Sequence, residues 1–208
     1  MPVTINGDGS ITGLSVGGLP NGTVDADTLA SDAVTTNKIA NSAVTPAKST
    51  ISGGISDFDT WYLTANTSGN TNPIVNNWSR WTSHGGTGTV TFAAPSSGIW
   101  TFPSTGYWHI DWTGKFENTG SQERGCNLYL YATTNNNTYV FIHESSVSLH
   151  DSGNTTKGLT RVTYIFDVTD TSTHKIKLAV GYQNASRTLL GHGAYPYSNV
   201  TFTKLRET

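Results

Sequence analysis

The sequence predicts a mainly β protein whose C-terminal part is an antiparallel sandwich or barrel of about ten strands. Three observations support this fold class. Thr, Gly, Ser and Asn make up 94 of the 208 residues, and charged residues account for 12%, which is about half the usual share. The residues that favour helices, Ala, Leu, Glu and Lys, are scarce. From residue 55 onward, apolar and polar residues alternate with a period of two, as in half-buried strands.

The chain divides into three predicted segments, residues 1–23, 24–54 and 55–208. All 22 aromatic residues lie at or after Phe58. A segment without aromatic residues cannot bury enough surface to offset the entropy cost of ordering by itself. The boundary falls in the Gly/Ser-rich stretch 49–56, which is typical of a linker. We therefore expect the N-terminal part to be either disordered or ordered by partner chains.

The first segment contains two short apolar stretches separated by an N-G-D-G sequence. Asn-Gly and Asp-Gly pairs between apolar stretches predict a hairpin. The apolar residues predicted to attach this segment to a partner are Val3, Ile5, Ile11, Leu14, Val16 and Leu19.

The second segment consists of three similar ten-residue units that begin at Val24, Val34 and Val44. One aliphatic residue about every five positions gives a thin apolar stripe, which parallel chains can bury along a common axis. Short helical turns capped by Thr or Asp fit between the valines. The alternative is a low-complexity linker, because the third unit loses the pattern after Lys48. The predicted trimer contacts of this stalk are Val24, Leu29, Val34, Ile39 and Val44.

The third segment is long enough to bury its own core. Alternating strands and turn signals without a convincing helix predict an antiparallel sandwich or barrel. The expected strands are 60–64, 88–92, 98–102, 107–116, 126–132, 138–145, 159–168, 174–183 and 199–205.

Two of these strands carry apolar or aromatic residues on both faces, so the second face needs its own cover. In a chain without helices, another subunit is the simplest cover, although a loop of the same chain is an alternative. The predicted trimer contacts on this part are Tyr129, Tyr131, Tyr139 and Phe141.

The stretch GIWTFPSTGYWHIDWTGKF resembles the signature of the complement-globular-head and tumour-necrosis-factor-like jelly rolls. In those families a Phe-rich strand leads into a Pro, and a Gly–aromatic pair opens the next strand. The resemblance covers residues 58–206 and implies a ten-stranded jelly roll that assembles as a tight homotrimer. The matching residues are Phe102, Pro103, Gly106, Tyr107 and Trp108.

Residues 3–48 resemble the N-terminal part of phage and cyanophage fibre proteins, which open with an INGDGSITGLSVGGLPNG-type segment followed by Val-Thr-x-x-Lys-Ile-Ala decads. Together the two resemblances imply a homotrimeric virion fibre on the outer surface or tail of the particle. Residues 1–23 would attach to other virion proteins, residues 24–54 would form the stalk, and residues 55–208 would face outward as a knob. The chain is short for a tail fibre, which leaves a capsid or collar position open.

The sequence offers little for catalysis or for charged partners. A net charge of −2 without a basic cluster excludes an electrostatic footprint for nucleic acid, and no 18-residue apolar run exists for membrane insertion. The six His residues are scattered and show no metal-ligand spacing, so we expect no metal and no cofactor. Cys126 is predicted to be a small buried apolar residue. We do not expect the protein to be an enzyme. A polysaccharide-degrading activity would need two paired carboxylates, and Asp111 and Glu144 form no recognisable pair.

Binding to a host-surface glycan is the better candidate, because aromatic rings stack on sugars and Asn, Ser and Thr bond to hydroxyl groups. Two predicted loops, NNWSRWTSHGG and GHGAYPYSN, carry suitable residues. Three alternatives stay open. The aromatic rings could fill the ends of the sandwich or a trimer interface, or the fibre could be purely structural. The chain could also be a secreted trimer of the complement-head type, but the sequence shows no signal-peptide pattern, which argues against this alternative. The candidate binding residues are Trp78, Trp81, His192, Tyr195 and Tyr197.

Overall fold

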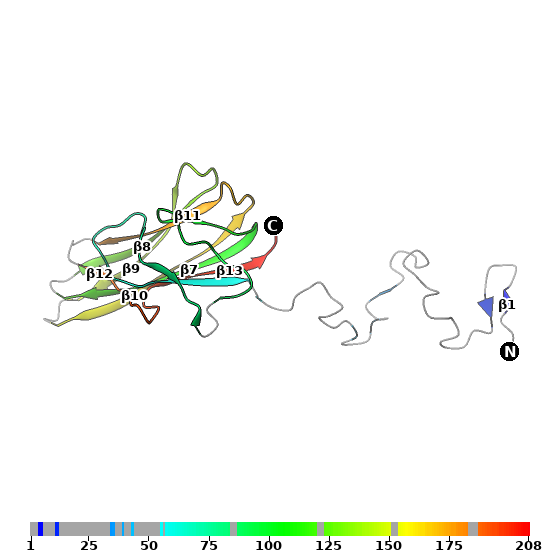
Figure 1. Cartoon of the computed structure of the whole chain (residues 1–208), viewed down its shortest axis with the longest axis horizontal. Helices are drawn as coiled ribbons and strands as arrows, with labels where there is room; N and C mark the ends of the chain where they lie inside the picture. Colours follow the sequence, from blue (N-terminus) through cyan, green and yellow to red (C-terminus); the bar gives the residue numbers. More distant parts are fainter. Residues whose placement is uncertain are drawn as a thin grey trace. The chain divides into compact units, whose positions relative to one another are not determined.

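The chain is described from a computed structural model, in which it divides into two units, Met1–Gly53 and Gly54–Thr208 (Figure 1). In the first unit, strand β1 (Thr4–Ile5) pairs antiparallel with strand β2 (Ile11–Thr12), as the N-G-D-G sequence predicts. The structure describes residues 4–5, 11–12, 34–35, 39, 43, 55, 57–83, 87–119, 123–150, 154–182 and 187–208.

The predicted anchor and stalk contacts lie largely outside the described residues. Ile5 and Ile11 face each other in the β1–β2 register. Val34 and Ile39 are exposed in the single chain, which leaves both side chains available to a partner. The anchor and stalk assignments stay predictions. The residues outside the described part are Val3, Leu14, Val16 and Leu19 of the anchor and Val24, Leu29 and Val44 of the stalk.

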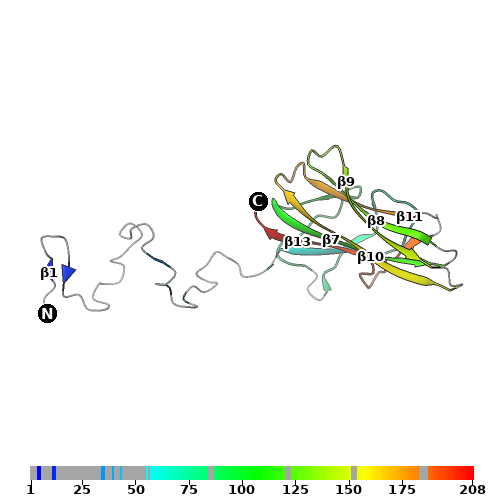
Figure 2. The ribbon, with the colours of Figure 1, turned by 180° about the vertical axis from the view of Figure 1, so that it is seen from behind.

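The second unit is a sandwich of two antiparallel sheets (Figure 1, Figure 2), which confirms the mainly β fold class. One sheet has seven strands: β3 (Phe58–Leu63), β4 (Thr67–Ser68), β5 (Trp78–Arg80), β7 (Gly106–Asn118), β10 (Thr156–Val168), β12 (Thr188–Leu189) and β13 (Asn199–Arg206). The other has four strands, in the order β6 (Ile99–Thr101), β11 (Lys175–Tyr182), β8 (Glu123–Thr133) and β9 (Val140–Leu149).

Strand β7 organises the seven-stranded sheet. Its whole length pairs with β10 along one edge, and β13 and β12 pair with successive parts of its other edge. At the rim of the sandwich, β9 of the second sheet comes close to β10: the hydroxyl groups of Ser145 and Thr160 lie 2.6 Å apart. His143 Nδ1 lies 3.1 Å from the carbonyl oxygen of Thr163. The two sheets are therefore joined by side-chain contacts at this edge.

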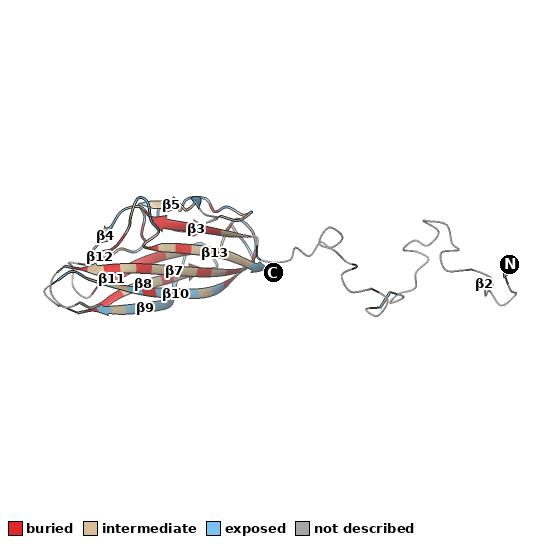
Figure 3. Cartoon of the chain, turned by 90° about the horizontal axis from the view of Figure 1, so that it is seen from below, coloured by how far each residue is buried: buried red, intermediate tan, exposed pale blue. Residues whose placement is uncertain are grey.

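The core fills the space between the sheets, and burial follows the alternation read from the sequence. Every even-numbered residue of β7 is buried, whereas the odd-numbered ones are only partly covered (Figure 3). Aromatic rings dominate this core: Phe92 stacks on Phe202 at 4.1 Å, and its ring lies 5.3 Å from that of Trp108. Cys126 is also fully buried, which agrees with its interpretation as a small apolar residue.

Gly106 shows why a Gly–aromatic pair opens β7. Its backbone φ is +130°, a conformation that residues with a Cβ rarely adopt. An added Cβ would also lie 2.6 Å from the carbonyl oxygen of Arg206 in β13. The motif that carries the resemblance therefore reflects the close approach of two neighbouring strands.

Two segments differ from the sequence prediction. The strand expected over 88–92 is wrong: this segment is irregular, although its Phe92 is fully buried. The loop expected around Trp78 is also wrong, because Trp78–Arg80 forms β5 and pairs with β3. A three-residue strand is too short to show alternation. The 88–92 segment makes one backbone hydrogen bond to β3, from Gly88 to Phe58, and is otherwise held by a buried side chain.

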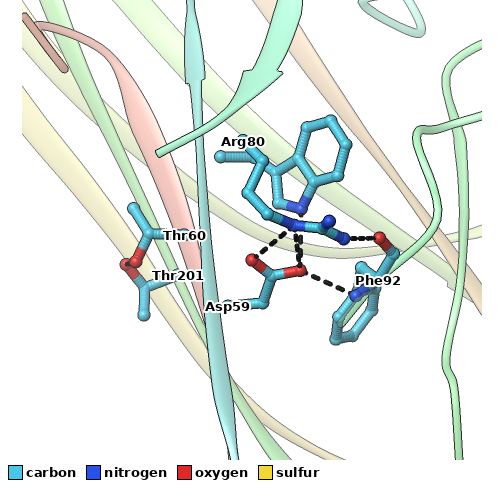
Figure 4. Close-up of polar contacts among 6 residues, drawn as sticks. Asp59, Thr60, Arg80, Phe92 and Thr201 are labelled. Carbon is cyan, nitrogen blue, oxygen red and sulfur yellow. Dashed lines mark hydrogen bonds and ion pairs between the residues drawn. The ribbon is translucent and has the colours of Figure 1, made fainter. Parts of the chain in front are cut away.

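That buried side chain is Asp59, which lies on β3 and is completely shielded from solvent. Its carboxylate accepts hydrogen bonds from the backbone N–H of Phe92 at 2.7 Å and from Trp61 Nε1 at 3.1 Å. Arg80 Nε donates to both carboxylate oxygens at 3.0 Å, and its guanidinium group also donates to the Phe92 carbonyl oxygen (Figure 4). One aspartate thus fastens β3, β5 and the 87–92 segment together.

Candidate ligand-binding site

The loop that joins β12 to β13 is held against the seven-stranded sheet by backbone hydrogen bonds. The Leu190 N–H donates to the Lys115 carbonyl oxygen at 2.8 Å, and the His192 N–H donates to the Leu63 carbonyl oxygen at 2.9 Å. Between them, a Cβ on Gly191 would lie 2.1 Å from the Ala65 carbonyl oxygen. Glycine is therefore required for the loop to lie this close to the chain beneath it.

Three predicted binding residues meet in this loop. The His192 ring lies 5.0 Å from that of Tyr195 and 5.1 Å from that of Tyr197, and the two tyrosine rings are nearly parallel. His192 Nδ1 accepts the Ala194 N–H at 3.0 Å, so a neutral ring carries its proton on Nε2, where it can donate to a ligand. Tyr195 is 58% exposed. The loop therefore presents an accessible ring beside a fixed donor.

The neighbouring sheet adds further aromatic and charged groups. Tyr62 Oη donates to the Gly193 carbonyl oxygen at 3.3 Å, and the centres of the Tyr62 and Trp81 rings lie 5.3 Å apart with the rings nearly perpendicular. Lys115 Nζ lies 4.3 Å from the centre of the Tyr197 ring, which is within the range of a cation–π interaction. We call the group Tyr62, Trp81, His192, Tyr195 and Tyr197 the loop cluster.

The fifth predicted residue, Trp78, does not join the loop cluster. Its ring packs edge-on against Trp100 at 5.3 Å and lies 5.5 Å from Trp112, and its Nε1 donates to the Ile74 carbonyl oxygen at 3.1 Å. The Trp78 ring thus packs at the edge of the hydrophobic core and does not belong to the candidate site. Tyr62 and Lys115 were not predicted from the sequence. The signal that could have found them is the alternation along β3 and β7, which indicates the face of the sheet on which each side chain lies.

The residues predicted as trimer contacts gather on the outer face of the four-stranded sheet. The Phe141 ring lies 6.2 Å from Tyr129 and 5.7 Å from Tyr131. Lys177 Nζ lies 4.8 Å from the centre of the Tyr131 ring and 5.1 Å from that of Tyr139. Burial raises the pKa of the Tyr139 phenol above its ordinary value. We call Tyr129, Tyr131, Tyr139 and Phe141 the aromatic face; their role as trimer contacts stays a prediction.

The two carboxylates weighed for polysaccharide cleavage lie on opposite faces of the sandwich. Asp111 points outward from β7, where it pairs with Arg161 of β10. Glu144 lies opposite Tyr129 on the outer face of the four-stranded sheet. Within the described ranges, no group of three His, Cys, Asp or Glu side chains is placed to hold a metal ion. Among the same residues, no helix capable of spanning a bilayer is found.

Comparison with known proteins identifies the fold of the second unit. No model of a protein family matches the chain, and no curated protein matches its sequence. The solved structure of Eiger TNF from S. frugiperda superposes with a TM-score of 0.54 at 11% identity, over 74% of this chain and 96% of that one. Murine APRIL at pH 5.0 superposes with a TM-score of 0.50 at 13% identity, over 71% and 98%. The second unit has a TNF-like jelly-roll fold.

This result confirms the TNF-like resemblance read from residues 102–108. Sequence identity of 11 to 13% supports likeness of fold and not of activity. Neither solved structure is named a virion protein, so the fibre assignment rests on the N-terminal resemblance. The function of the TNF-like unit therefore depends on the residues that its own surface presents.

Proposed function

We propose that the chain is a homotrimeric bacteriophage fibre whose TNF-like knob, residues 55–208, binds a glycan on the host surface. The observation that carries the binding role is the loop cluster, in which an exposed Tyr195 lies beside His192. The role is adhesion without catalysis. Residues 1–23 attach the fibre to a tail, collar or capsid protein, and residues 24–54 form the stalk.

The TNF-like fold is known for trimers, and the outer face of the seven-stranded sheet offers a surface for one. Ile165 of β10 points outward and is 53% exposed, whereas Leu159, 60% exposed on the same strand, lies opposite Lys115 at the loop-cluster end. Burying one such side chain contributes roughly 1.5–3 kcal/mol, so assembly would be favoured. Ile165 lies opposite His109, six residues along β7 from Lys115 of the loop-cluster end. Trimer contact at Ile165 therefore leaves the other end of the face available to a ligand.

A neutral sugar fits the chemistry of the loop cluster. A flat ring such as Tyr195 packs against the apolar face of a pyranose, and His192 Nε2–H can donate to a hydroxyl group. Three knobs on one stalk then multiply a weak single-site affinity, because each bound knob raises the effective concentration for the next.

Binding of the full-length protein to an array of bacterial and cyanobacterial surface polysaccharides tests the proposal. We expect Tyr195→Ala to weaken the retained signal about tenfold or more, since each of the three linked sites loses its ring stacking. Tyr195→Phe, which keeps the ring, should retain most of the signal. If the wild-type protein retains no polysaccharide across the panel, the adhesion role is wrong and a purely structural fibre is favoured.

The anchor assignment predicts a separate result. Removing residues 1–23 should leave a soluble trimer that no longer enters virus particles, because the knob and stalk are untouched. Particle purification followed by immunoblotting measures incorporation. Co-purification of the truncated protein with virions at the wild-type level would show that another segment attaches the fibre.

A further inference from the structure

A pocket of about 400 Å³ opens on the outer face of the four-stranded sheet, apart from the loop cluster. Tyr129 and Tyr131 of β8 form one wall, and residues 70–72 form the other. Between the walls runs β11, whose Val180 exchanges two backbone hydrogen bonds of 2.9 Å with Thr71. The segment 70–72 thus continues the sheet edge and is held in place by strand-like pairing.

Gly181 of β11 forms part of the pocket floor. A Cβ at this position would lie 2.6 Å from Tyr129 Cε2 and 3.0 Å from its hydroxyl oxygen. The missing side chain lets the Tyr129 ring rest on the strand and keeps the floor open. The same end of the ring is also held by Asn127, whose Nδ2 donates to the Tyr129 hydroxyl group at 2.8 Å.

The opposite wall supplies uncharged hydrogen-bonding groups. Asn70 Oδ1 accepts the backbone N–H of Tyr182 at 2.6 Å, which leaves the Nδ2 amide group as the part of this side chain that can donate to a ligand. Asn70 and Asn72 are exposed. The residues that line the pocket carry no carboxylate, amine or guanidinium group.

We propose that this pocket binds a neutral carbohydrate. Its volume lies in the usual range for small-ligand sites, about 300–1,000 Å³. Tyrosine rings on one side and amide groups on the other match a pyranose, which has an apolar face and a rim of hydroxyl groups. No lining residue is a cation, and Lys177, whose Nζ packs on the Tyr131 ring, does not line the pocket. Because the loop cluster lies on the opposite face of the sandwich, this site stands independently of the proposed one there.

Isothermal titration of the full-length protein with neutral oligosaccharides tests the inference. The probes are glucose, galactose, mannose and N-acetylglucosamine tetrasaccharides, with tetragalacturonate as the anionic comparison. We expect at least one neutral probe to bind, and Tyr129→Ala to weaken that binding about tenfold, the loss that corresponds to one stacked ring. Gly181→Ala and the exposed Asn72→Ala should also weaken it.

Val140→Ala is the matched control, because Val140 is exposed on β9 of the same sheet and does not line the pocket. Thermal melts of each variant show whether it folds, and Asn72→Ala keeps the test valid if Gly181→Ala does not. Unchanged binding in Tyr195→Ala, together with loss in the pocket variants, supports this second site. Absence of binding to every neutral probe overturns it, as does binding that Tyr195→Ala abolishes and the pocket variants leave intact.

Discussion

Replacing Asp59 by alanine is expected to lower the free energy of unfolding of the TNF-like knob by about 3–5 kcal/mol, because a partly exposed arginine and two buried donors lose a fully buried acceptor. The change leaves Arg80 Nε, Trp61 Nε1 and the Phe92 N–H without their acceptor. Since Asp59 is fully buried, water cannot replace the carboxylate without opening the core. Phe92, which stacks on Phe202, would lose its tether to β3.

Asp111→Ala is the matched control for this experiment. Asp111 also pairs with an arginine, but Arg161 is exposed and the pair lies on the sheet surface. Exposed ion pairs contribute roughly 0–1 kcal/mol. Urea unfolding followed by tryptophan fluorescence, at one fixed protein concentration, compares the two variants. Equal effects would show that Asp59 does not fasten the 87–92 segment to β3.

Replacing Ile165 by aspartate is expected to convert the trimer into monomers. An isoleucine side chain that is 53% exposed in the single chain would be covered in the proposed trimer. Burial of a carboxylate without a partner costs several kcal/mol, and each of the three copies would carry that cost. The single chain should still fold, because Ile165 points away from the core.

Phe141→Asp provides the comparison, since Phe141 belongs to the aromatic face that the sequence predicts as the trimer contact. Size-exclusion chromatography with multi-angle light scattering gives the mass of each variant. The interface proposed on β10 predicts that Phe141→Asp remains trimeric, whereas the contacts predicted from the sequence on the aromatic face predict a monomer. A monomeric Phe141→Asp beside a trimeric Ile165→Asp would place the interface on the four-stranded sheet and exclude it from β10.

Much of the knob could be predicted from the sequence because its long strands alternate regularly. The alternation around Trp108, Ile110 and Trp112 matches the buried side of β7 residue by residue. The Gly–aromatic pair that opens the same strand also has a physical cause. The backbone at Gly106 has a positive φ, and Gly106 lies close to Arg206 of the neighbouring strand. Local pattern and tertiary packing agree wherever a strand is long enough to show a period.

The features that escaped prediction depend on contacts between distant residues. Nothing near Phe92 in the sequence signals that its backbone N–H bonds to Asp59, 33 positions earlier. Trp78 lies among loop-forming residues, yet it packs on Trp100 and Trp112. The pocket beside Gly181 likewise joins segments that lie far apart in the chain. In each case the partners become neighbours only after the sheets have formed.

The mass of the wild-type protein in solution tests the central claim, that this TNF-like chain works as a trimer. Sedimentation equilibrium of the full-length protein at micromolar concentration measures that mass directly. We expect a single species of three times the 22.2 kDa chain mass. A species with the mass of one chain would contradict the trimer, and with it the fibre.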